Sequence, residues 1–280
     1  MSDASPGSFR GRVFVVTGAS SGLGYEIAQA LAAEGAHLVL AGRAREPLAA
    51  AALACRERGA SAIAVPTDVT LDADCSALIE CARAEFGGVD GLVAAAGLGM
   101  WARFGELSGP EVMEPLMAVN YWGVVQPAFH ALPDLRARNG MLVVISSVQG
   151  RIGVPWHSGY AAAKHAVQGF CDSLRLEEGE RLAVLTVLAH WIRGTELRAR
   201  ALGSDGRPRG SAAAGHGGDA MLAEEAAARV VAAMRQRRRE LWIPRHFRLV
   251  GILSSLVPAL TDRLIRRRVE REHARQPRDD

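Results

Sequence analysis

Residues 17–24 read TGASSGLG, and this stretch decides the fold because of what lies on either side of it. It follows the continuous apolar run RVFVVT at residues 12–17, which is typical of a buried strand, and it opens the helical apolar pattern of residues 23–34. Glycines at such a turn let backbone N–H groups approach a phosphate at the helix N-terminus, where the helix dipole favours an anion. The position of the turn therefore predicts a dinucleotide-binding site.

The same alternation of short apolar runs and helical stretches continues along the chain. Further strands are expected at residues 37–41, 62–66, 91–95, 141–146, 183–188 and 241–243. Helices are expected at residues 23–34, 46–58, 72–86, 110–132, 158–179 and 223–237. Strands that are apolar throughout are buried on both faces, which implies a parallel sheet covered by helices on both sides. The predicted fold is α/β, a doubly wound, Rossmann-like sheet of about seven strands.

Length and composition are those of one globular domain with short additions. The 280 residues are 49% hydrophobic, and a formal net charge of only +3 argues for neither nucleic acid nor an acidic partner. We expect a catalytic domain over residues 12–244, preceded by a flexible arm at residues 1–11. Residues 198–219, rich in Gly, Ala, Ser and Arg, are expected to form a mobile lid over the substrate.

The N-terminus and the cysteines bear on the cellular compartment. The first residues are polar and lack the apolar segment of a secretory signal, so a cytoplasmic location is expected. Cys55, Cys75, Cys81 and Cys171 are scattered without the spacing of metal ligands. We interpret them as reduced thiols and expect no metal site.

The end of the second strand bears on the choice of nicotinamide cofactor. It reads AGR at residues 41–43 and lacks the carboxylate that would bind a ribose 2′-hydroxyl. Arg43 has the planar donor fork that suits a 2′-phosphate, and Ser20 or Ser21 is expected to add a hydroxyl. These features favour NADP(H) over NAD(H), the alternative being that Arg43 is a solvated loop charge. Asp68, after the third strand, is expected either to accept from the adenine amino group or to cap a helix.

Three residues have the chemistry of an acid/base site. Ser147 lies at the end of the fifth strand, where parallel sheets bind their ligands. Tyr160 and Lys164 are four residues apart and share one helix face. A cation beside a phenol favours the phenolate, so we expect Lys164 to bring the pKa of Tyr160 nearer to neutral. Lys164 is also the only lysine among the 33 Lys and Arg residues, which favours a chemical role for it.

Together, the glycine-rich turn, the Ser147–Tyr160 spacing and the YAAAK sequence at residues 160–164 resemble the short-chain dehydrogenase/reductase family, over most of the chain. The resemblance implies hydride transfer between C4 of a nicotinamide and a carbonyl or carbinol carbon. It also implies that Asn120 joins Ser147, Tyr160 and Lys164, and holds a water in a proton relay.

Two segments depart from the family pattern. Residues 94–97 read AAAG where the family usually has Asn-Asn-Ala-Gly, which puts cofactor affinity or rigidity in question. Residues 189–195 read AHWIRGT in place of a Pro-Gly pair, although the expected Thr195 is kept. The residues expected to bind the cofactor are Gly18, Ser20, Ser21, Gly22, Leu23, Gly24, Arg43, Asp68, Val69, Ala95, Ala96, Gly97, Tyr160, Lys164 and Thr195.

Loops expected near the substrate carry three of the five tryptophans. We therefore expect a bulky apolar or aromatic ketone or secondary alcohol, the alternative being that these rings only pack the rim. The residues expected to line the substrate are Trp101, Gln149, Trp156, His190 and Trp191.

Residues 245–280 form a basic, amphipathic extension. An apolar stretch at residues 249–260 is too short for a typical membrane span, is interrupted by Pro258 and is flanked by arginines. Such a segment suits peripheral contact with an anionic membrane surface, cover for the substrate crevice, or packing between subunits. We expect a homodimer or homotetramer.

The leading function is an NADP(H)-dependent oxidoreductase of ketones and secondary alcohols. A cofactor-binding regulator that lost turnover is the first alternative. A redox-neutral enzyme, such as an isomerase or cyclase that uses Tyr160 as its acid, is the second.

Overall fold

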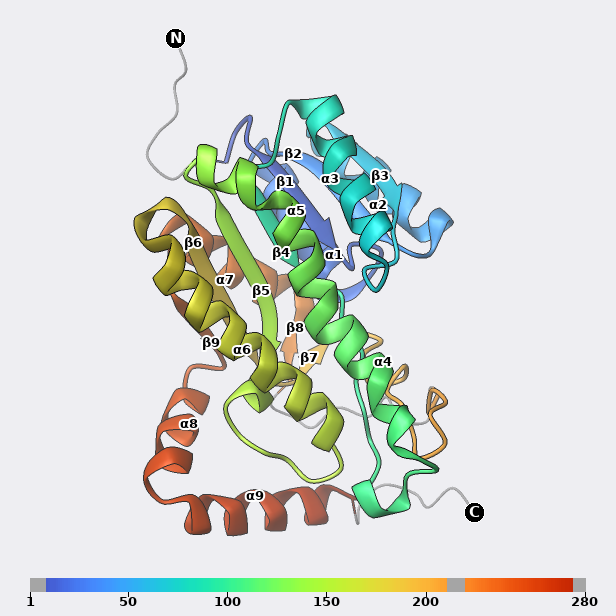
Figure 1. Cartoon of the computed structure of the whole chain (residues 1–280), viewed down its shortest axis with the longest axis vertical. Coiled ribbons are helices and arrows are strands. Elements are labelled where there is room, and N and C mark those ends of the chain that lie inside the picture. The colour runs from blue at the N-terminus through green and yellow to red at the C-terminus, as the bar shows by residue number, and fades with distance from the viewer. Residues whose placement is uncertain (1–8, 211–219, 274–280) are drawn as a thin grey trace.

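The computed structural model of this chain describes residues 9–210 and 220–273, and a seven-stranded parallel sheet forms its centre (Figure 1). The strand order is β3-β2-β1-β4-β5-β6-β9, so the chain winds outward from β1 in both directions, as predicted. The strands are β1 (Val13–Thr17), β2 (His37–Gly42), β3 (Ala62–Pro66), β4 (Gly91–Ala94), β5 (Met141–Ser147), β6 (Ala183–Ala189) and β9 (Glu240–Ile243).

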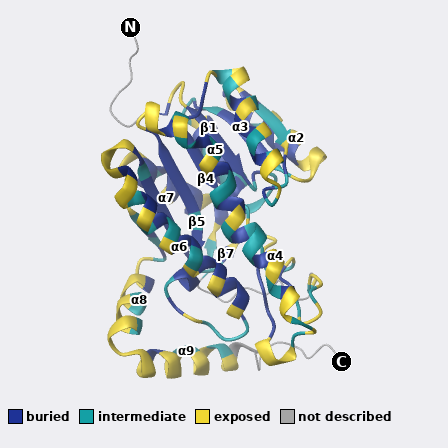
Figure 2. Cartoon of the chain, in the orientation of Figure 1, coloured by how far each residue is buried: buried dark blue, intermediate teal, exposed yellow. Residues whose placement is uncertain are grey.

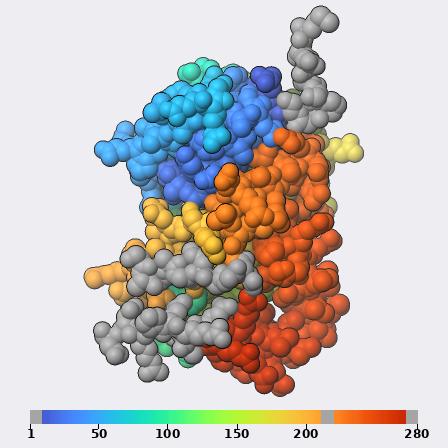
Figure 3. All heavy atoms as spheres, turned by 180° about the vertical axis from the view of Figure 1, so that it is seen from behind, coloured from blue at the N-terminus to red at the C-terminus, as the bar shows by residue number. Residues whose placement is uncertain are grey.

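Helices cover both faces of this sheet. One hydrophobic cluster joins the sheet to α1 (Gly22–Ala33), α2 (Arg45–Glu57) and α7 (Ala223–Arg235). A second joins the opposite face to α3 (Asp72–Phe86), α5 (Gly123–Ala137) and α6 (Ser158–Glu178). The inner strands β1, β2, β4, β5 and β6 are almost wholly buried between the two layers (Figure 2), and α1 and α7 lie side by side on the far face (Figure 3). This double cover explains why the strands are apolar on both sides.

The strand register brings the carboxyl ends of the central strands together. Thr17, the last residue of β1, pairs with Ala41 of β2 on one side and with Ala94 of β4 on the other. The connection after β1 leads to β2, on one side of β1, whereas the connection after β4 leads to β5, on the other side. The loops after β1 and β4 therefore diverge around a crevice. Ligands of doubly wound sheets bind at such a switch point.

Residues 110–132, expected to be mostly helical, are helical but do not form one regular helix. The chain instead forms η2 (Pro110–Met113), α4 (Glu114–Met117), the π-helical turn η3 (Ala118–Trp122) and then α5. The side-chain amide of Asn120 donates to the carbonyl of Leu116, four residues earlier, at 3.0 Å. This is the carbonyl that the Asn120 backbone N–H would use in an α-helix, and a side chain inserted there widens the turn.

Two segments that the sequence predicts to be mobile make defined contacts where the structure describes them. Phe9, within the expected flexible arm, is 3% exposed and packs edge-on against Phe14 with ring centroids 5.1 Å apart. In the expected lid, the Leu202 N–H donates to the Gly99 carbonyl at 3.0 Å, and the Leu202 carbonyl accepts from the Trp101 N–H at 2.9 Å. Residues 1–8 of the arm and 211–219 of the lid lie outside the described residues.

Short elements that the sequence did not predict complete the loops. They are η1 (Phe104–Glu106), η4 (Val148–Gly150), η5 (Gly179–Arg181), β7 (Ile192–Arg193) and β8 (Met221–Leu222). β7 and β8 pair in parallel and so connect the segment after β6 to the start of α7. Their two-residue length is below what apolar periodicity detects.

The C-terminal extension forms α8 (Phe247–Leu256) and α9 (Pro258–His273), which break at Pro258 as expected. Phe247, Val250 and Ile265 pack against Val148 and Ile152, so the extension covers the loop after β5. An exposed apolar face remains on the two helices. Its members are Leu249, Ile252, Leu253, Leu256, Val257, Leu260 and Leu264. Among the described residues, no helix combines the length and apolar character needed to cross a membrane.

Candidate active site

A cavity of about 1400 Å³ opens at the carboxyl ends of the central strands. It joins the region expected for the cofactor to the region expected for the substrate. Most of the residues predicted from the sequence line it. They are Gly18, Ser20, Ser21, Gly22, Leu23, Gly24, Arg43, Asp68, Val69, Ala95, Ala96, Gly97, Trp101, Ser147, Gln149, Tyr160, Lys164, His190, Trp191 and Thr195.

The glycine-rich turn has the geometry of a phosphate cradle. Gly18 has φ +65°, and a Cβ there would lie 2.8 Å from the backbone nitrogen of Ala96. A Cβ on Gly24 would lie 2.4 Å from the Gly18 carbonyl oxygen. The N-cap residue of α1, Ser21, makes no side-chain capping hydrogen bond, and the first turn has no acidic residue. The N-terminal N–H groups of α1 therefore suit the pyrophosphate of a dinucleotide.

The hydroxyl of Thr17 fastens the loop that follows β4. It accepts hydrogen bonds from the backbone N–H groups of Ala95 and Ala96 at 3.1 and 3.3 Å, and the Thr17 side chain is fully buried. The loop therefore keeps a polar attachment to β1 even though residues 94–97 lack the usual asparagines. Sequence reasoning missed Thr17, because it reads as the last residue of an apolar strand.

Arg43 and Asp68 face the cavity from the ends of β2 and β3. Burial acts to raise the pKa of Asp68, but hydrogen bonds from Thr70 and the charge of Arg43 lower it below its usual value. One Asp68 oxygen, Oδ1, accepts from the Thr70 N–H at 3.0 Å and from its hydroxyl at 2.8 Å. Asp68 thus stabilises its own turn while it lines the cavity, and Arg43 is an exposed cation at the same end of the cavity.

The structure resolves the path of the chain after β6. Thr195 lies over the start of α1, where a Cβ on Gly22 would be 3.3 Å from its methyl carbon. The Thr195 hydroxyl donates to the carbonyl of Ile192, the first residue of β7, at 3.1 Å. The altered 189–195 segment therefore still delivers Thr195 to the glycine-rich turn.

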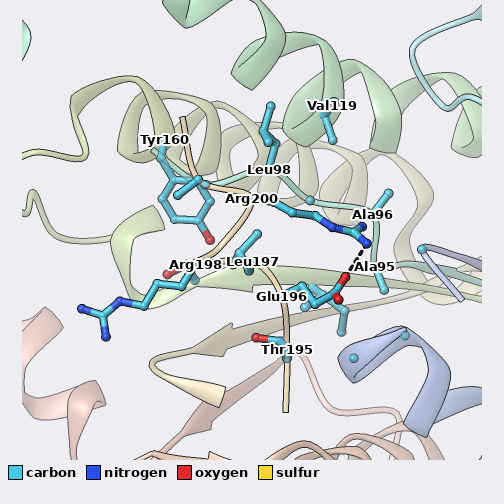
Figure 4. A pocket seen from close by; sticks show the side chains of 18 of the residues that line it. Ala95, Ala96, Leu98, Val119, Tyr160, Thr195, Glu196, Leu197, Arg198 and Arg200 are labelled. Carbon is cyan, nitrogen blue, oxygen red and sulfur yellow. Dashed lines mark ion pairs between the residues drawn. The ribbon is translucent and has the colours of Figure 1, made fainter. Parts of the chain in front are cut away.

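The structure brings Ser147, Tyr160 and Lys164 together at the end of β5. The Lys164 ammonium lies 5.6 Å from the centroid of the Tyr160 ring and donates to the Ile145 carbonyl at 3.0 Å. The Ser147 hydroxyl is hydrogen-bonded to Tyr160 and also accepts from the Gln149 N–H at 3.2 Å. Figure 4 shows the Tyr160 hydroxyl pointing into the cavity, toward residues 195–198.

Burial dominates the titration of this group. It raises the pKa of Tyr160 to about 12, against a smaller lowering by the hydrogen bond with Ser147. It lowers the pKa of Lys164 to about 8. The expected lowering of the Tyr160 pKa is therefore wrong for the protein alone, because burial raises this pKa and only the hydrogen bond with Ser147 acts against it. Tyr160 is protonated at neutral pH, which is the form of a general acid.

Asn120 and Trp156 lie outside the cavity lining. Asn120 is fully buried, and its amide exchanges two hydrogen bonds with the backbone of Leu98, at 3.2 and 2.8 Å. It ties η3 to the loop after β4, a positioning role. Trp156 packs behind Trp101 with ring centroids 5.6 Å apart.

His157 and Arg198 line the cavity but were not singled out in the sequence. His157 is 6% exposed, and burial together with the nearby charge of Arg198 lowers its pKa to about 4. Its ring contacts that of Trp101, with centroids 4.9 Å apart. Arg198 lies over Trp101 and Trp191. Lone histidines and arginines in loops carry no periodic signal, so only the folded chain brings them together.

Comparison with known proteins places the chain in a family. The short chain dehydrogenase family model matches residues 12–202. An "11-beta-hydroxysteroid dehydrogenase" of Pinus massoniana is 38% identical over 197 residues, which are 70% of this chain and 55% of that protein. The chain spans about half the length of the plant relatives it matches.

Solved structures agree with this assignment. A short chain dehydrogenase/reductase from Burkholderia phymatum in complex with NAD has a TM-score of 0.77 and 27% identity, covering 89% of this chain and 96% of that one. An alcohol dehydrogenase from Thermococcus sibiricus complexed with 5-hydroxy-NADP has a TM-score of 0.70 and 27% identity, covering 82% and 95%. The fold and site define a nicotinamide dinucleotide-binding protein, and the chain belongs to the short-chain dehydrogenase/reductase family.

Proposed function

We propose that this protein is an NADP(H)-dependent oxidoreductase that interconverts a bulky hydrophobic ketone and its secondary alcohol. One observation carries the proposal: a protonated Tyr160, hydrogen-bonded to Ser147 and one helical turn from a buried Lys164, faces the cavity that also contains the phosphate cradle. The bound nicotinamide supplies the hydride for reduction, or accepts it for oxidation. The residues of the chain provide the acid/base chemistry and the orientation.

In the reductive direction, Tyr160 donates its proton to the substrate oxygen as negative charge develops there. The Ser147 hydroxyl donates a hydrogen bond to the same oxygen, which stabilises that charge. Burial lowers the pKa of Lys164 to about 8, so the side chain is charged at neutral pH. This charge stabilises the phenolate that Tyr160 becomes when it has given up its proton. In the oxidative direction the phenolate takes the proton back.

The preference for NADP(H) is supported by the cation at the end of β2. Arg43 lines the cavity beside Gly42, and the Ser20 hydroxyl is within 3.4 Å of where a Gly42 Cβ would stand. A guanidinium with a hydroxyl nearby suits a 2′-phosphate, whereas a 2′-hydroxyl would call for a carboxylate. The relatives in solved structures include one bound to NAD and one bound to an NADP derivative.

The bulky, hydrophobic substrate is supported by the aromatic rings that line the cavity. Trp101 and Trp191 line the cavity, with ring centroids 6.5 Å apart. His157, neutral because its pKa is about 4, packs between Trp101 and Tyr160. Flat rings so placed bury the apolar body of a substrate next to the reacting oxygen.

The proposal is tested by NADPH consumption across ketones of graded size. Tyr160→Phe should abolish turnover while it leaves NADPH binding unchanged, and Tyr121→Phe, which alters a tyrosine outside the cavity, is the matched control. Full activity in Tyr160→Phe would refute the acid/base assignment. Tight NADPH binding with no consumption on any ketone would favour the regulator, and product formation without net cofactor oxidation would favour the redox-neutral enzyme.

A cytoplasmic location, homodimer or homotetramer assembly and peripheral membrane contact stay predictions. Packing between subunits, or contact with a membrane, would use the exposed apolar face of α8 and α9.

A further inference from the structure

The outward side of α8 is apolar. Four large residues spaced as one helix face are between 47% and 73% exposed, and they are Leu249, Ile252, Leu253 and Leu256. The inward side packs on the domain, where Gly251 lies so close to Trp242 that a Cβ would be 2.8 Å from the ring. A contiguous exposed apolar surface is typical of a site that meets a membrane or another molecule.

The next helix, α9, carries more of this exposed apolar face and adds positive charge to it. Leu260 and Leu264 are each 55% exposed and lie one helical turn apart. Arg267 and Arg271 follow at positions i+7 and i+11 from Leu260, on the same side of the helix, and both are exposed. Apolar and cationic side chains therefore share the outward side of α9.

The positive charge of the chain is concentrated in this extension. Residues 245–271 contain seven arginines and two acidic residues, a formal charge of +5, whereas the whole chain has +3. The remainder of the chain is therefore net negative. A cationic, apolar segment on an otherwise acidic chain is attracted to a negatively charged surface.

The inward side of the extension contacts the end of the cavity that is expected to hold the substrate. The Phe247 and His190 rings have centroids 4.2 Å apart, and His190 lines the cavity. Phe247 also packs with Val148 and Ile152, in the loop that follows Ser147. The start of α8 is therefore part of the packed fold, and a surface that met its outward side would lie behind this wall of the cavity.

The charge pattern favours a lipid surface over a second copy of the chain. In a twofold pair the same patch meets itself, so the arginines of α9 would approach the arginines of the other copy. Like charges brought together in an interface cost free energy. An anionic bilayer offers apolar chains to the leucines and negative headgroups to the arginines around them, which is the pattern of helices that lie in a membrane interface.

We propose that the exposed apolar face of α8 and α9 docks on an anionic phospholipid surface. Its leucines enter the boundary between headgroups and acyl chains, and Arg267 and Arg271 contact the phosphates. The extension is then an attachment device that holds the cavity wall at His190 beside the membrane. This proposal is independent of the proposed reaction, because it requires no turnover.

Co-sedimentation of the full chain with vesicles tests the proposal. The probes are vesicles of phosphatidylcholine alone and vesicles in which about one third of the lipid is phosphatidylglycerol. Binding to the anionic vesicles should be at least about tenfold tighter than to the neutral ones, and added salt should weaken it. Equal binding to both kinds of vesicle, or binding to neither, would overturn the proposal.

Single substitutions with matched controls assign the contact to this face. Leu256→Gln, at a residue that is 73% exposed, should weaken binding to the anionic vesicles by about threefold to tenfold. Leu176→Gln makes the same change on α6, at a residue that is 81% exposed, and should have no effect. Arg267→Gln should weaken binding by about fivefold, whereas Arg45→Gln, at an exposed arginine of α2, should not. Equal losses in a variant and its control would overturn the proposal.

Light scattering of the lipid-free protein tests the other occupant of the face. A smaller assembly in Leu256→Gln, together with unchanged vesicle binding, would assign the face to a second copy of the chain and overturn the proposal. An unchanged molecular mass together with weakened vesicle binding would support it. NADPH binding should stay unchanged in all four variants, because none of these residues lines the cavity.

Discussion

The ammonium of Lys164 lies 5.6 Å from the ring centroid of Tyr160 and donates to the carbonyl of Ile145 at 3.0 Å. The lysine is 3% exposed, and the same burial moves both residues toward their neutral forms. At neutral pH the Tyr160 phenol is therefore protonated, and the Lys164 ammonium carries a charge whose burial costs free energy. In the proposed reaction, this cation acts only once negative charge develops on the Tyr160 oxygen.

Lys164→Met should make the protein more stable at pH 7 although it abolishes activity. The pKa of Lys164 is about 8 in the folded chain and near 10.5 when unfolded, so between these values the unfolded chain binds more protons. Stability from this group therefore rises with pH across that window and is lowest below pH 8. Replacing the ammonium by a methylene-rich side chain should raise the free energy of unfolding by about 1–3 kcal/mol at pH 7.

Chemical denaturation at pH 7 and at pH 9.5 measures this effect. The advantage of Lys164→Met should shrink at the higher pH, and Lys164→Arg, which keeps a charge, should show no gain. A less stable Lys164→Met at pH 7 would mean that the hydrogen bond to Ile145 outweighs the cost of burying the charge.

Arg43→Gln should shift the cofactor preference. Loss of a charged donor to the 2′-phosphate should raise the KM for NADPH by about tenfold to a hundredfold and leave the KM for NADH within about twofold. Steady-state kinetics with both cofactors measures the change. Arg45→Gln removes the neighbouring charge outside the cavity lining and serves as control. Equal effects on NADPH and NADH would contradict the role of Arg43.

His157 should make the protein sensitive to acid. Burial, and next the charge of Arg198, lowers its folded pKa to about 4 from 6.5, so the unfolded chain binds more protons between these values. Stability therefore falls as the pH falls through this window, by about 2–3 kcal/mol from this residue. In His157→Gln the free energy of unfolding should depend less on pH from 6.5 to 4. The exposed His246→Gln is the control, and an unchanged slope in His157→Gln would refute the assignment.

Thr17→Val should loosen the loop that follows β4. The substitution keeps the shape but leaves the N–H groups of Ala95 and Ala96 without their acceptor, so the free energy of unfolding should fall by about 2 kcal/mol. Because these residues line the cavity, the KM for the cofactor should rise as well. Thr17→Ser keeps the hydroxyl, so a similar rise in that variant would show that the hydrogen bonds are not the cause.

The sequence predicted the central strands to within about a residue because they are buried on both faces. Continuous apolar runs such as residues 38–41 are typical of strands covered on both faces of a parallel sheet, and these residues are all buried. The prediction was wrong where tertiary contacts overrode local preference. The Asn120 side-chain amide donates to the carbonyl of Leu116 and so widens the turn η3. Phe9 lies in a segment of polar composition, yet its ring packs on that of Phe14.

The candidate site divides in the same way. The glycine-rich turn and the Tyr160–Lys164 pair could be predicted from the sequence. In each case the residues lie within a few positions of one another, so the local conformation of a single segment sets their geometry. Other contacts of the site join residues that are distant in sequence. Residues 95 and 96 bond to Thr17, and Thr195 lies against Gly22. Arg198 lies over the rings of Trp101 and Trp191. Only the packed sheet and its loops bring those residues together, since loop–loop contacts leave no periodicity in the sequence. The sequence by itself thus determined the fold and the candidate acid/base pair, and the tertiary structure decided which other side chains line the candidate site.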